Sequence, residues 1–563
     1  GGEYRTVLQL ASHRKDVNLV RVILNHGADV NIRGGKYETA LQAGACGSSE
    51  IVKLLLEKGA DPNIQGGEYG TALQAAGSLG SLESLALLLE KGSDPNIQGG
   101  QYGTALQAAA FQGSPQNVAL LLEKGADPNI QGASFYGTAL QAAAFKGYEE
   151  HVALLLEKGA DPNIQGGQYG TALQAAAFQG SPQNVALLLE KGADPNIQGG
   201  QYETALQAAA FKGYEEHVAL LLEKGADPNI QGGQYGTALQ AAAFQGSPQN
   251  VALLLEKGAD PNIQGGEYGT ALQAAAFKGW KSALPLLLEN GADPNIQGGQ
   301  YGTALQAAAF QGSPQNVALL LEKGADPNIQ GGQYGTALQA AAFQGSPQNV
   351  ALLLEKGADP NTQGGEYGTA LQAAAFKGWK SALPLLLEKG ADPNIQGGQY
   401  GTALQAAAFQ GSPQNVALLL EKGADPNIQG GQYGTALQAA AFQGSPQNVA
   451  LLLEKGADPN IQGGEYGTAL QAAAFKGWKS ALPLLLENGA DPNIQGGQYG
   501  TALQAAAFKG YEEHVTLLLE KGAAPNIQGG EYGTALQAAA FKGWKSALPL
   551  LLEKGADPNI QAQ

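Results

Sequence analysis

The feature that most constrains the fold of this chain is a sequence period of 33 residues. The segment GGQYGTALQAAAFQGSPQNVALLLEKGADPNIQ at 99–131 recurs almost unchanged from positions 166, 232, 298, 331, 397 and 430. One such copy is too short to bury its own apolar stripe, so neighbouring copies must bury each other. We therefore expect one elongated array, although a length of 563 residues alone would suggest about four globular domains.

We treat 1–563 as a single repeat domain with seventeen repeats, numbered in chain order. The second repeat is one residue short, the fifth has one extra residue, and Ala562 and Gln563 follow the last. The repeats are 1–33, 34–65, 66–98, 99–131, 132–165, 166–198, 199–231, 232–264, 265–297, 298–330, 331–363, 364–396, 397–429, 430–462, 463–495, 496–528 and 529–561.

Each repeat has the pattern of two short helices followed by a turn. In repeat 4, Thr104 is placed to cap a first helix, ALQAAAFQ, which Gly113 ends. Ser114 then caps a second helix with Pro115 at its first position, and Gly125 closes it. The segment ADPNIQGGQYG is rich in turn residues and predicts a hairpin-like finger. The expected fold class is all-α.

A helix–turn–helix unit with a turn, repeating every 33 residues, resembles the ankyrin repeat family. The family's T-P-L-H-x-A segment corresponds to TALQAA at 104–109, and its L-L-L-x-x-G-A-D-x-N segment to LLLEKGADPN at 120–129. Ala105 replaces the family's proline and Gln107 its histidine. We expect the turn to survive, because an amide both donates and accepts hydrogen bonds. The resemblance implies a curved superhelical ankyrin-repeat solenoid of about 17 repeats, each with a hairpin finger.

The sequence of the repeats also resembles that of the near-identical ankyrin arrays of filamentous fungi. Those arrays often form the C-terminal sensor half of NACHT-type, NLR-like proteins. The chain neither begins with Met nor contains one, and its last repeat shows no capping change. We therefore expect a part of a longer protein, with apolar residues exposed on the outer face of the last repeat.

The charge and apolar patterns exclude several classes of partner. The net charge of −17 is spread along the repeats, whereas nucleic acids and anionic membranes select clustered Lys and Arg. No apolar run approaches the roughly 18 residues of a membrane span. A lone cysteine, Cys46, excludes an internal disulfide framework and indicates a reducing, cytoplasmic (intracellular) location.

From repeat 4 onward, the residues after the first helix occur in three versions. These are QGSPQN in seven repeats, KGYEEH in three and KGWKSA in four. The last version continues with a leucine run that contains Pro285. If Ser282 is the N-cap, Pro285 lies at N3, where backbone N–H groups lack intrahelical partners. This version is either a neutral way of making the same corner or a marker of contact points, since an exposed tryptophan suits an interface.

Tyr102 and Phe111 have equivalents in almost every repeat, and we expect them to form two ladders along the array. The rings either stack as part of the core or line the concave groove. In ankyrin-family binders, partners usually touch the turn tips and the groove side of the first helix. The candidate partner-binding residues are Gln101, Phe111, Gln112, Tyr148, Gln168, Tyr214, Trp280, Gln300, Trp379, Gln399, Trp478, Tyr511 and Trp544.

No residue pattern indicates catalysis, a metal or a cofactor. His151 and His217 lie two repeats apart, too far to share a zinc ion at helix spacings of roughly 8–10 Å, and we interpret them as helix-start residues. Glu149 and Glu150 suit the positive end of a helix. Cys46 stands where other repeats have an aromatic residue, which favours a packing role. The sequence contains no phosphate-binding glycine loop.

The main hypothesis is a non-catalytic scaffold that binds a protein partner through its groove and loop edges. Identical repeats would add weak contacts as avidity. The fungal resemblance implies the sensor part of a larger NLR-like protein. The alternative is an elastic or spacer solenoid with a mechanical role. We expect no cofactor, small-molecule substrate, nucleic-acid partner or membrane partner.

Overall fold

The computed structural model describes residues 4–112, 114–132 and 137–561. These residues form thirty-four short α-helices and no extended strand. The chain divides into two compact bodies. One extends to Ala271 and takes in Glu289–Ala292, and the other comprises Leu272–Leu288 and the chain from Asp293 onward.

Each repeat, labelled as in the sequence analysis, contributes a first, odd-numbered helix and a second, even-numbered helix. The first helices are α1 (Val7–His13), α3 (Ala40–Ala45), α5 (Ala72–Leu79), α7 (Ala105–Gln112), α9 (Ala139–Lys146), α11 (Ala172–Gln179), α13 (Ala205–Lys212), α15 (Ala238–Gln245), α17 (Ala271–Lys278), α19 (Ala304–Gln311), α21 (Ala337–Gln344), α23 (Ala370–Lys377), α25 (Ala403–Gln410), α27 (Ala436–Gln443), α29 (Ala469–Lys476), α31 (Ala502–Lys509) and α33 (Ala535–Lys542). The second helices are α2 (Val17–Asn25), α4 (Ser49–Glu57), α6 (Leu82–Glu90), α8 (Pro115–Glu123), α10 (Glu149–Glu157), α12 (Pro182–Glu190), α14 (Glu215–Glu223), α16 (Pro248–Glu256), α18 (Ala283–Glu289), α20 (Pro314–Glu322), α22 (Pro347–Glu355), α24 (Ala382–Glu388), α26 (Pro413–Glu421), α28 (Pro446–Glu454), α30 (Ala481–Glu487), α32 (Glu512–Glu520) and α34 (Ala547–Glu553).

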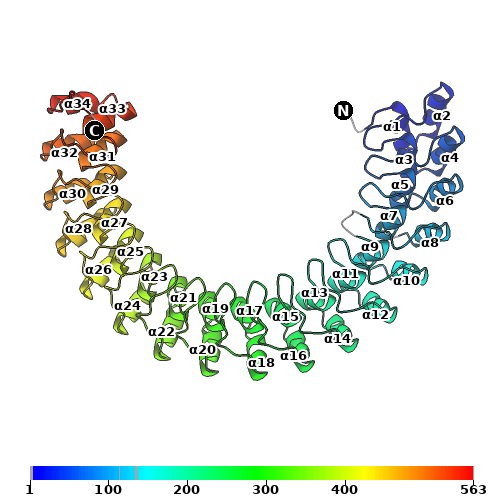
Figure 1. The fold of residues 1–563 in the computed structure, drawn as a ribbon, viewed down its shortest axis with the longest axis horizontal. Helices are drawn as coiled ribbons and strands as arrows, with labels where there is room; N and C mark the ends of the chain where they lie inside the picture. The colour runs from blue at the N-terminus through cyan, green and yellow to red at the C-terminus, as the bar shows by residue number, and fades with distance from the viewer. Residues whose placement is uncertain (1–3, 113, 133–136, 562–563) are drawn as a thin grey trace. The chain divides into compact units, whose positions relative to one another are not determined.

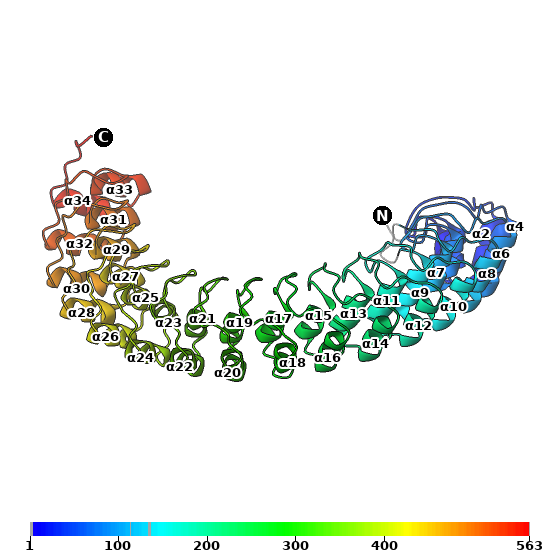
Figure 2. The same cartoon turned by 60° about the horizontal axis from the view of Figure 1, so that its bottom comes forward.

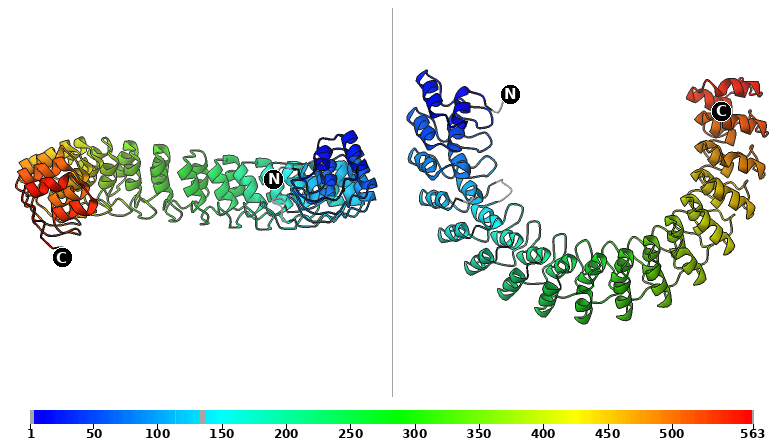
Figure 3. Two further views of the ribbon diagram at one scale, coloured as in Figure 1. Left: turned by 90° about the horizontal axis from the view of Figure 1, so that it is seen from above. Right: turned by 180° about the vertical axis from the view of Figure 1, so that it is seen from behind.

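Within each body, the helix pairs lie side by side in chain order (Figure 1). First helices pack on the first helices of neighbouring repeats, and second helices pack on second helices. The loops that lead into the first helices project from one side of each body as fingers (Figure 2). The second helices lie on the other side (Figure 3). The all-α repeat architecture predicted from the sequence is therefore confirmed.

The core is built from alanine on the first helix and leucine or valine on the second. In α25, Leu404 is 1% exposed and the alanines at 406–408 are fully buried, while Val416 and Leu419 of α26 are also fully buried. A helix that is apolar on all sides belongs inside a protein. The alanines keep the first helices thin, so that a neighbour packs on either side. Each buried leucine contributes about 2 kcal/mol.

In every repeat before the last, a buried glutamine joins the first helix to the finger of the next repeat. In repeat 4, Thr104 N–H donates to Gln107 Oε1 at 2.6 Å, and Gln107 N–H donates to Thr104 Oγ1 at 3.2 Å. Gln107 Nε2 donates to the carbonyls of Ile130 (3.0 Å) and Gly137 (2.5 Å). Gln107 is 3% exposed. The predicted threonine cap is thus confirmed, and the glutamine that replaces the family's histidine holds the turn.

An asparagine in the turn after each second helix also binds the following repeat. Asn427 Nδ2 donates to the carbonyl of Gly456 at 3.0 Å, and the N–H of Asp458 donates to Asn427 Oδ1 at 2.8 Å. In repeat 16, Ala524 replaces the aspartate, but its N–H still donates to Asn493 Oδ1 at 2.7 Å. The bond between repeats depends on backbone groups and on the asparagine, so it survives this substitution.

The fingers run close together and exchange backbone hydrogen bonds. The N–H of Gln432 donates to the carbonyl of Gln399 at 3.2 Å, and the N–H of Gln399 donates to that of Glu366 at 3.3 Å. Gly398 has φ of 60°, and a Cβ there would overlap the backbone of Tyr367 in the preceding finger. Glycine is therefore required at this position by both conformation and space.

The proline in the leucine run occupies the position predicted for it. α24 begins at Ala382 with Ser381 as N-cap, which puts Pro384 at N3, where a missing N–H costs no intrahelical bond. The expected serine capping is only partly right. Ser381 has helical dihedral angles and no side-chain cap bond, and Ser114 also makes none. Gly113, predicted to end α7, lies outside the described residues; its equivalent Gly411 ends α25 with φ of 80°.

Replacing Gln405 with alanine should open repeats 13 and 14 locally. Thr402 N–H and the carbonyls of Ile428 and Gly434 would lose the partner that Gln405 provides. We expect a loss of about 2–3 kcal/mol in the local opening free energy, read from hydrogen exchange of the Thr402 amide and of the other backbone amides of repeats 13 and 14. The control is Gln410→Ala on the exposed end of the same helix. Equal exchange rates in the two variants would contradict this role.

Candidate functional site

From Phe145 onward, the finger tyrosines and the first-helix phenylalanines form a file of rings within each compact body. Ring centroids lie 5.2 Å apart between Tyr301 and Phe310, 4.7 Å between Phe310 and Tyr334, and 5.0 Å between Tyr334 and Phe343. The prediction of two separate ladders is therefore wrong, because each tyrosine inserts between successive phenylalanines. The rings stack between repeats and are half-buried, so their edges also reach the surface.

Exposed glutamines border this aromatic file on both sides in the QGSPQN repeats. We call the surface made by the finger tips, the aromatic file and the C-terminal ends of the first helices the finger face. In repeat 4, it includes Gln101 at the finger tip, the half-buried Phe111, and Gln112, whose Nε2 donates to the hydroxyl of Tyr102 at 2.9 Å. These three residues lie on one surface, and partner binding by them stays a prediction.

The other predicted finger-tip glutamines occupy the equivalent position in their own repeats. Gln300 and Gln399 are exposed, and Gln168 is half-buried. Gln168 Nε2 donates to Oε1 of Gln201 in the next finger at 2.9 Å. The amides at the tips thus bond partly to one another and partly face solvent.

Lysines at the ends of the first helices lie over phenylalanine rings of the preceding repeat. Lys377 Nζ is 4.1 Å from the ring centroid of Phe343, and Lys476 Nζ is 4.0 Å from that of Phe442. A cation over an aromatic face is worth about 0.5–1 kcal/mol at a partly exposed site. These contacts were not predicted from the sequence. The sequence feature that could have indicated them is the residue at the end of the first helix, which is lysine in the KGYEEH and KGWKSA versions and glutamine in the QGSPQN version.

The predicted tryptophan sites lie at the corner between the two helices and contact the preceding repeat. Trp379 donates its indole N–H to the carbonyl of Phe343 at 2.9 Å, and Trp478 and Trp544 make the same bond to Phe442 and Phe508. These side chains remain 39–41% exposed, and Trp280 is 38% exposed. The tryptophans therefore bind neighbouring repeats while keeping part of the indole at the surface.

The three predicted tyrosine sites, Tyr148, Tyr214 and Tyr511, are half-buried N-cap residues of α10, α14 and α32. Each lies against the histidine three residues later, with ring centroids 5.1, 5.1 and 5.6 Å apart. These histidines occur in the first turn, as expected, but they are 3–4% exposed and pack in the core. Their equivalents in the QGSPQN repeats are buried asparagines such as Asn184.

Electrostatics along the finger face favour neutral phenols. Burial, reinforced by the neighbouring Glu465, raises the pKa of Tyr466 to about 12. Burial, reinforced by Glu68, also raises the pKa of the Cys46 thiol to about 12. A thiol that stays protonated at neutral pH is a poor nucleophile. Among the described residues, no group of three or more His, Cys, Asp or Glu side chains is arranged to hold a metal ion.

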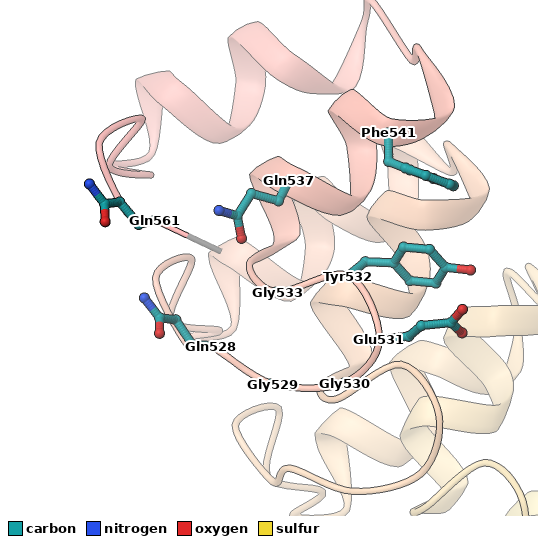
Figure 4. Close-up of a pocket in the computed structure, with 9 residues that line it drawn as sticks. All are labelled: Gln528, Gly529, Gly530, Glu531, Tyr532, Gly533, Gln537, Phe541 and Gln561. Atoms are coloured by element: carbon teal, nitrogen blue, oxygen red, sulfur yellow. The ribbon is translucent and has the colours of Figure 1, made fainter. Parts of the chain in front are cut away.

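The last repeat shows the finger face with one end open (Figure 4). A hollow of about 470 Å³ lies beside its finger, and Tyr532 and Phe541 form one wall with ring centroids 5.0 Å apart. Gln537 donates to the carbonyl of Ile560 at 2.8 Å. Phe541 is 69% exposed and Leu552 46% exposed, which confirms the expected apolar outer face. The hollow has an open, mixed lining with no convergent catalytic groups.

Comparison with protein-family models gives repeated matches to one family, described as ankyrin repeats (3 copies). The matches overlap along almost the whole sequence. The chain belongs to the ankyrin repeat family. The matched residues are 2–66, 72–166, 130–199, 173–265, 239–331, 272–364, 338–430, 371–463, 436–529 and 470–562. A comparison with curated proteins finds no match.

Membership of this family sets the general function. Ankyrin repeats generally mediate contacts between proteins, and the family is generally non-catalytic. In the part of the chain that the structure describes, no helix has the length and apolar character needed to cross a bilayer.

The tryptophan contact between ankyrin repeats can be tested with two glycines of similar conformation. Gly345 has φ of 81°, and a Cβ there would lie 2.5 Å from Trp379 Cε2. Gly357 has φ of 89°, and a Cβ there would meet nothing within 4 Å. Both alanine variants bear backbone strain of about 1 kcal/mol, but only Gly345→Ala should also displace the indole. Urea unfolding should therefore show a larger loss for Gly345→Ala, with a red shift of tryptophan emission. Matching losses would argue against the contact.

The buried histidines should make stability depend on pH. Burial lowers the pKa of His151, His217 and His514, partly offset by neighbouring glutamates and, at His514, by a backbone hydrogen bond. The unfolded chain then binds more protons, so stability should fall as pH drops through the unfolded histidine pKa of about 6.5. Replacing all three with asparagine, the residue at this position in seven other repeats, should reduce the loss between pH 7.5 and 5.5 in urea titrations. An unchanged pH dependence would contradict this explanation.

Proposed function

We propose that this ankyrin array binds a protein partner along its finger face. The observation that carries the proposal is the repeated surface of half-buried aromatic edges with exposed glutamines on either side. Partly exposed aromatic groups give apolar contact area at low entropic cost, and amides supply hydrogen bonds. The candidate residues of the sequence analysis lie on this face or, for the tryptophans and the cap tyrosines, at the adjoining corner between the helices.

The avidity of such an array follows from its repetition. Each QGSPQN repeat offers the same ring pair and the same amides, so a partner with a repeated or long surface gains one weak contact per repeat. A recognition role in a larger NLR-like protein of a fungal cytoplasm is the setting that fits this use best. A spacer role is the second candidate, supported by the asparagine and glutamine bonds that join successive repeats.

A photo-crosslinking experiment tests the binding face. A benzophenone amino acid replaces Gln399 or Gln432 on the finger face, or Gln414 or Gln447 at exposed positions of the second helices. All four positions are exposed glutamines, so the substitutions are chemically matched. We expect a discrete crosslinked partner from the finger positions only. Crosslinks from the second helices alone would contradict the proposal, and no discrete partner from any position would favour the spacer.

A further inference from the structure

The aromatic file has a repeat distance that identifies the conformation of its ligand. Equivalent rings of neighbouring repeats lie 6.5 Å apart for Tyr400 and Tyr433, and 6.4 Å apart for Phe409 and Phe442. The pair Tyr499 and Tyr532 gives 6.3 Å. At the junctions of repeats 13 with 14 and 16 with 17, the surface therefore presents the same aromatic edge at an interval of 6.3–6.5 Å.

Only an extended peptide reproduces this interval with its own side chains. A β-strand rises roughly 3.2–3.4 Å per residue, so side chains on one of its faces recur every 6.4–6.8 Å. A polyproline helix repeats about every 9.3 Å and an α-helix about every 5.4 Å. An extended ligand would thus place one side chain on each repeat. The rise of two strand residues exceeds the spacing of equivalent rings by about 0.2 Å, and this difference accumulates to only about 1 Å over six repeats.

The borders of the file suit the backbone of such a ligand. An extended chain directs its N–H and C=O groups to either side, and each needs a partner when the surface is covered. Gln399 and Gln432 border the file on the finger side, and Gln410 and Gln443 border it on the helix side; all four are exposed. A glutamine amide both donates and accepts, so these borders can bind peptide groups without regard to sequence.

Charge interrupts these neutral borders at every third repeat of the segment 298–495. Repeats 12 and 15 carry Glu366 and Glu465 at the finger tips, and Lys377 and Lys476 at the helix ends. Glu366 lies beside Tyr367 on the finger side, where burial and the charge of the glutamate raise the pKa of the phenol. Neither lysine forms an ion pair within the described part of the chain, and each ammonium lies beside the aromatic file. Because an extended ligand spans each repeat with two residues, a charged site at every third repeat corresponds to one position in six along the ligand.

We propose that repeats 10–15 bind an extended peptide segment with apolar side chains at alternate positions and an acidic residue at one position in six. The alternate apolar side chains lie on the ring edges, the glutamines bind the peptide backbone, and the acidic residues face Lys377 and Lys476. This inference rests on the proposed function and specifies the chemistry of the partner.

The test uses the full chain and labelled synthetic peptides of roughly twelve residues, two per repeat. The first peptide has threonine or serine at every even position, valine at the odd positions, and glutamate in place of valine at two odd positions six apart, so that the glutamates lie on the same face as the valines. The second has the same composition with valines spaced three and four apart. The third is the first with both glutamates changed to glutamine. Binding is measured by fluorescence anisotropy.

We expect the first peptide to bind at least about tenfold more tightly than the second, and several-fold more tightly than the third. The double variant Lys377→Gln/Lys476→Gln should bind the first peptide only as well as the third, and should bind the third as the unchanged protein does. Glutamine occurs at this position in seven other repeats, so the variant keeps a residue that the fold already accepts.

Equal binding of the first two peptides, no binding of any peptide, or no effect of the lysine variant on the first peptide would overturn the inference. Crosslinking of a protein partner from Gln399 or Gln432 together with any of these results would leave the proposed function standing and reject the extended ligand. A failure of both experiments would reject the finger face as a binding surface.

Discussion

The structure depends on one buried side chain per repeat, the glutamine of the first helix. Gln107 and its equivalents accept from the threonine at the start of their own helix and donate to carbonyls of the following finger. A single amide therefore satisfies groups in two repeats and fixes where the next finger lies. Because the finger carries the tyrosine of the aromatic file, the same hydrogen bonds position the surface that we assign to binding.

The local elements could be predicted because their causes are local. A threonine before ALQAAAFQ, a proline at the first position of α8 and a proline at N3 of α24 each follow from the geometry of a helix start, which involves only nearby residues. The serine caps were less predictable. Ser114 and Ser381 form no cap bond, whereas Ser247, before the same N1 proline, accepts from the N–H of Asn250 at 3.4 Å.

Contacts between repeats were harder to foresee from the sequence. A 33-residue period says that neighbours pack, but not that Tyr334 inserts between Phe310 and Phe343 to make one file instead of two. It also does not say that Lys377 reaches backward over the preceding ring. Such contacts depend on the offset between successive helix pairs, which the spacing of residues along one repeat does not contain. The candidate glutamines could still be grouped, because turn tips and helix ends share a surface in any stack of this kind.

The indole of Trp379 lies on Gly345, and Gly477 stands in the same place beneath the phenol ring of Tyr511. All three versions of the corner contain this glycine, whichever residue they offer to the following repeat. Any version can therefore follow any other without a steric clash, and the chain accommodates gene-level exchange of whole repeats. An array of this design can change the order of its charges by unequal recombination while its helices continue to pack as before.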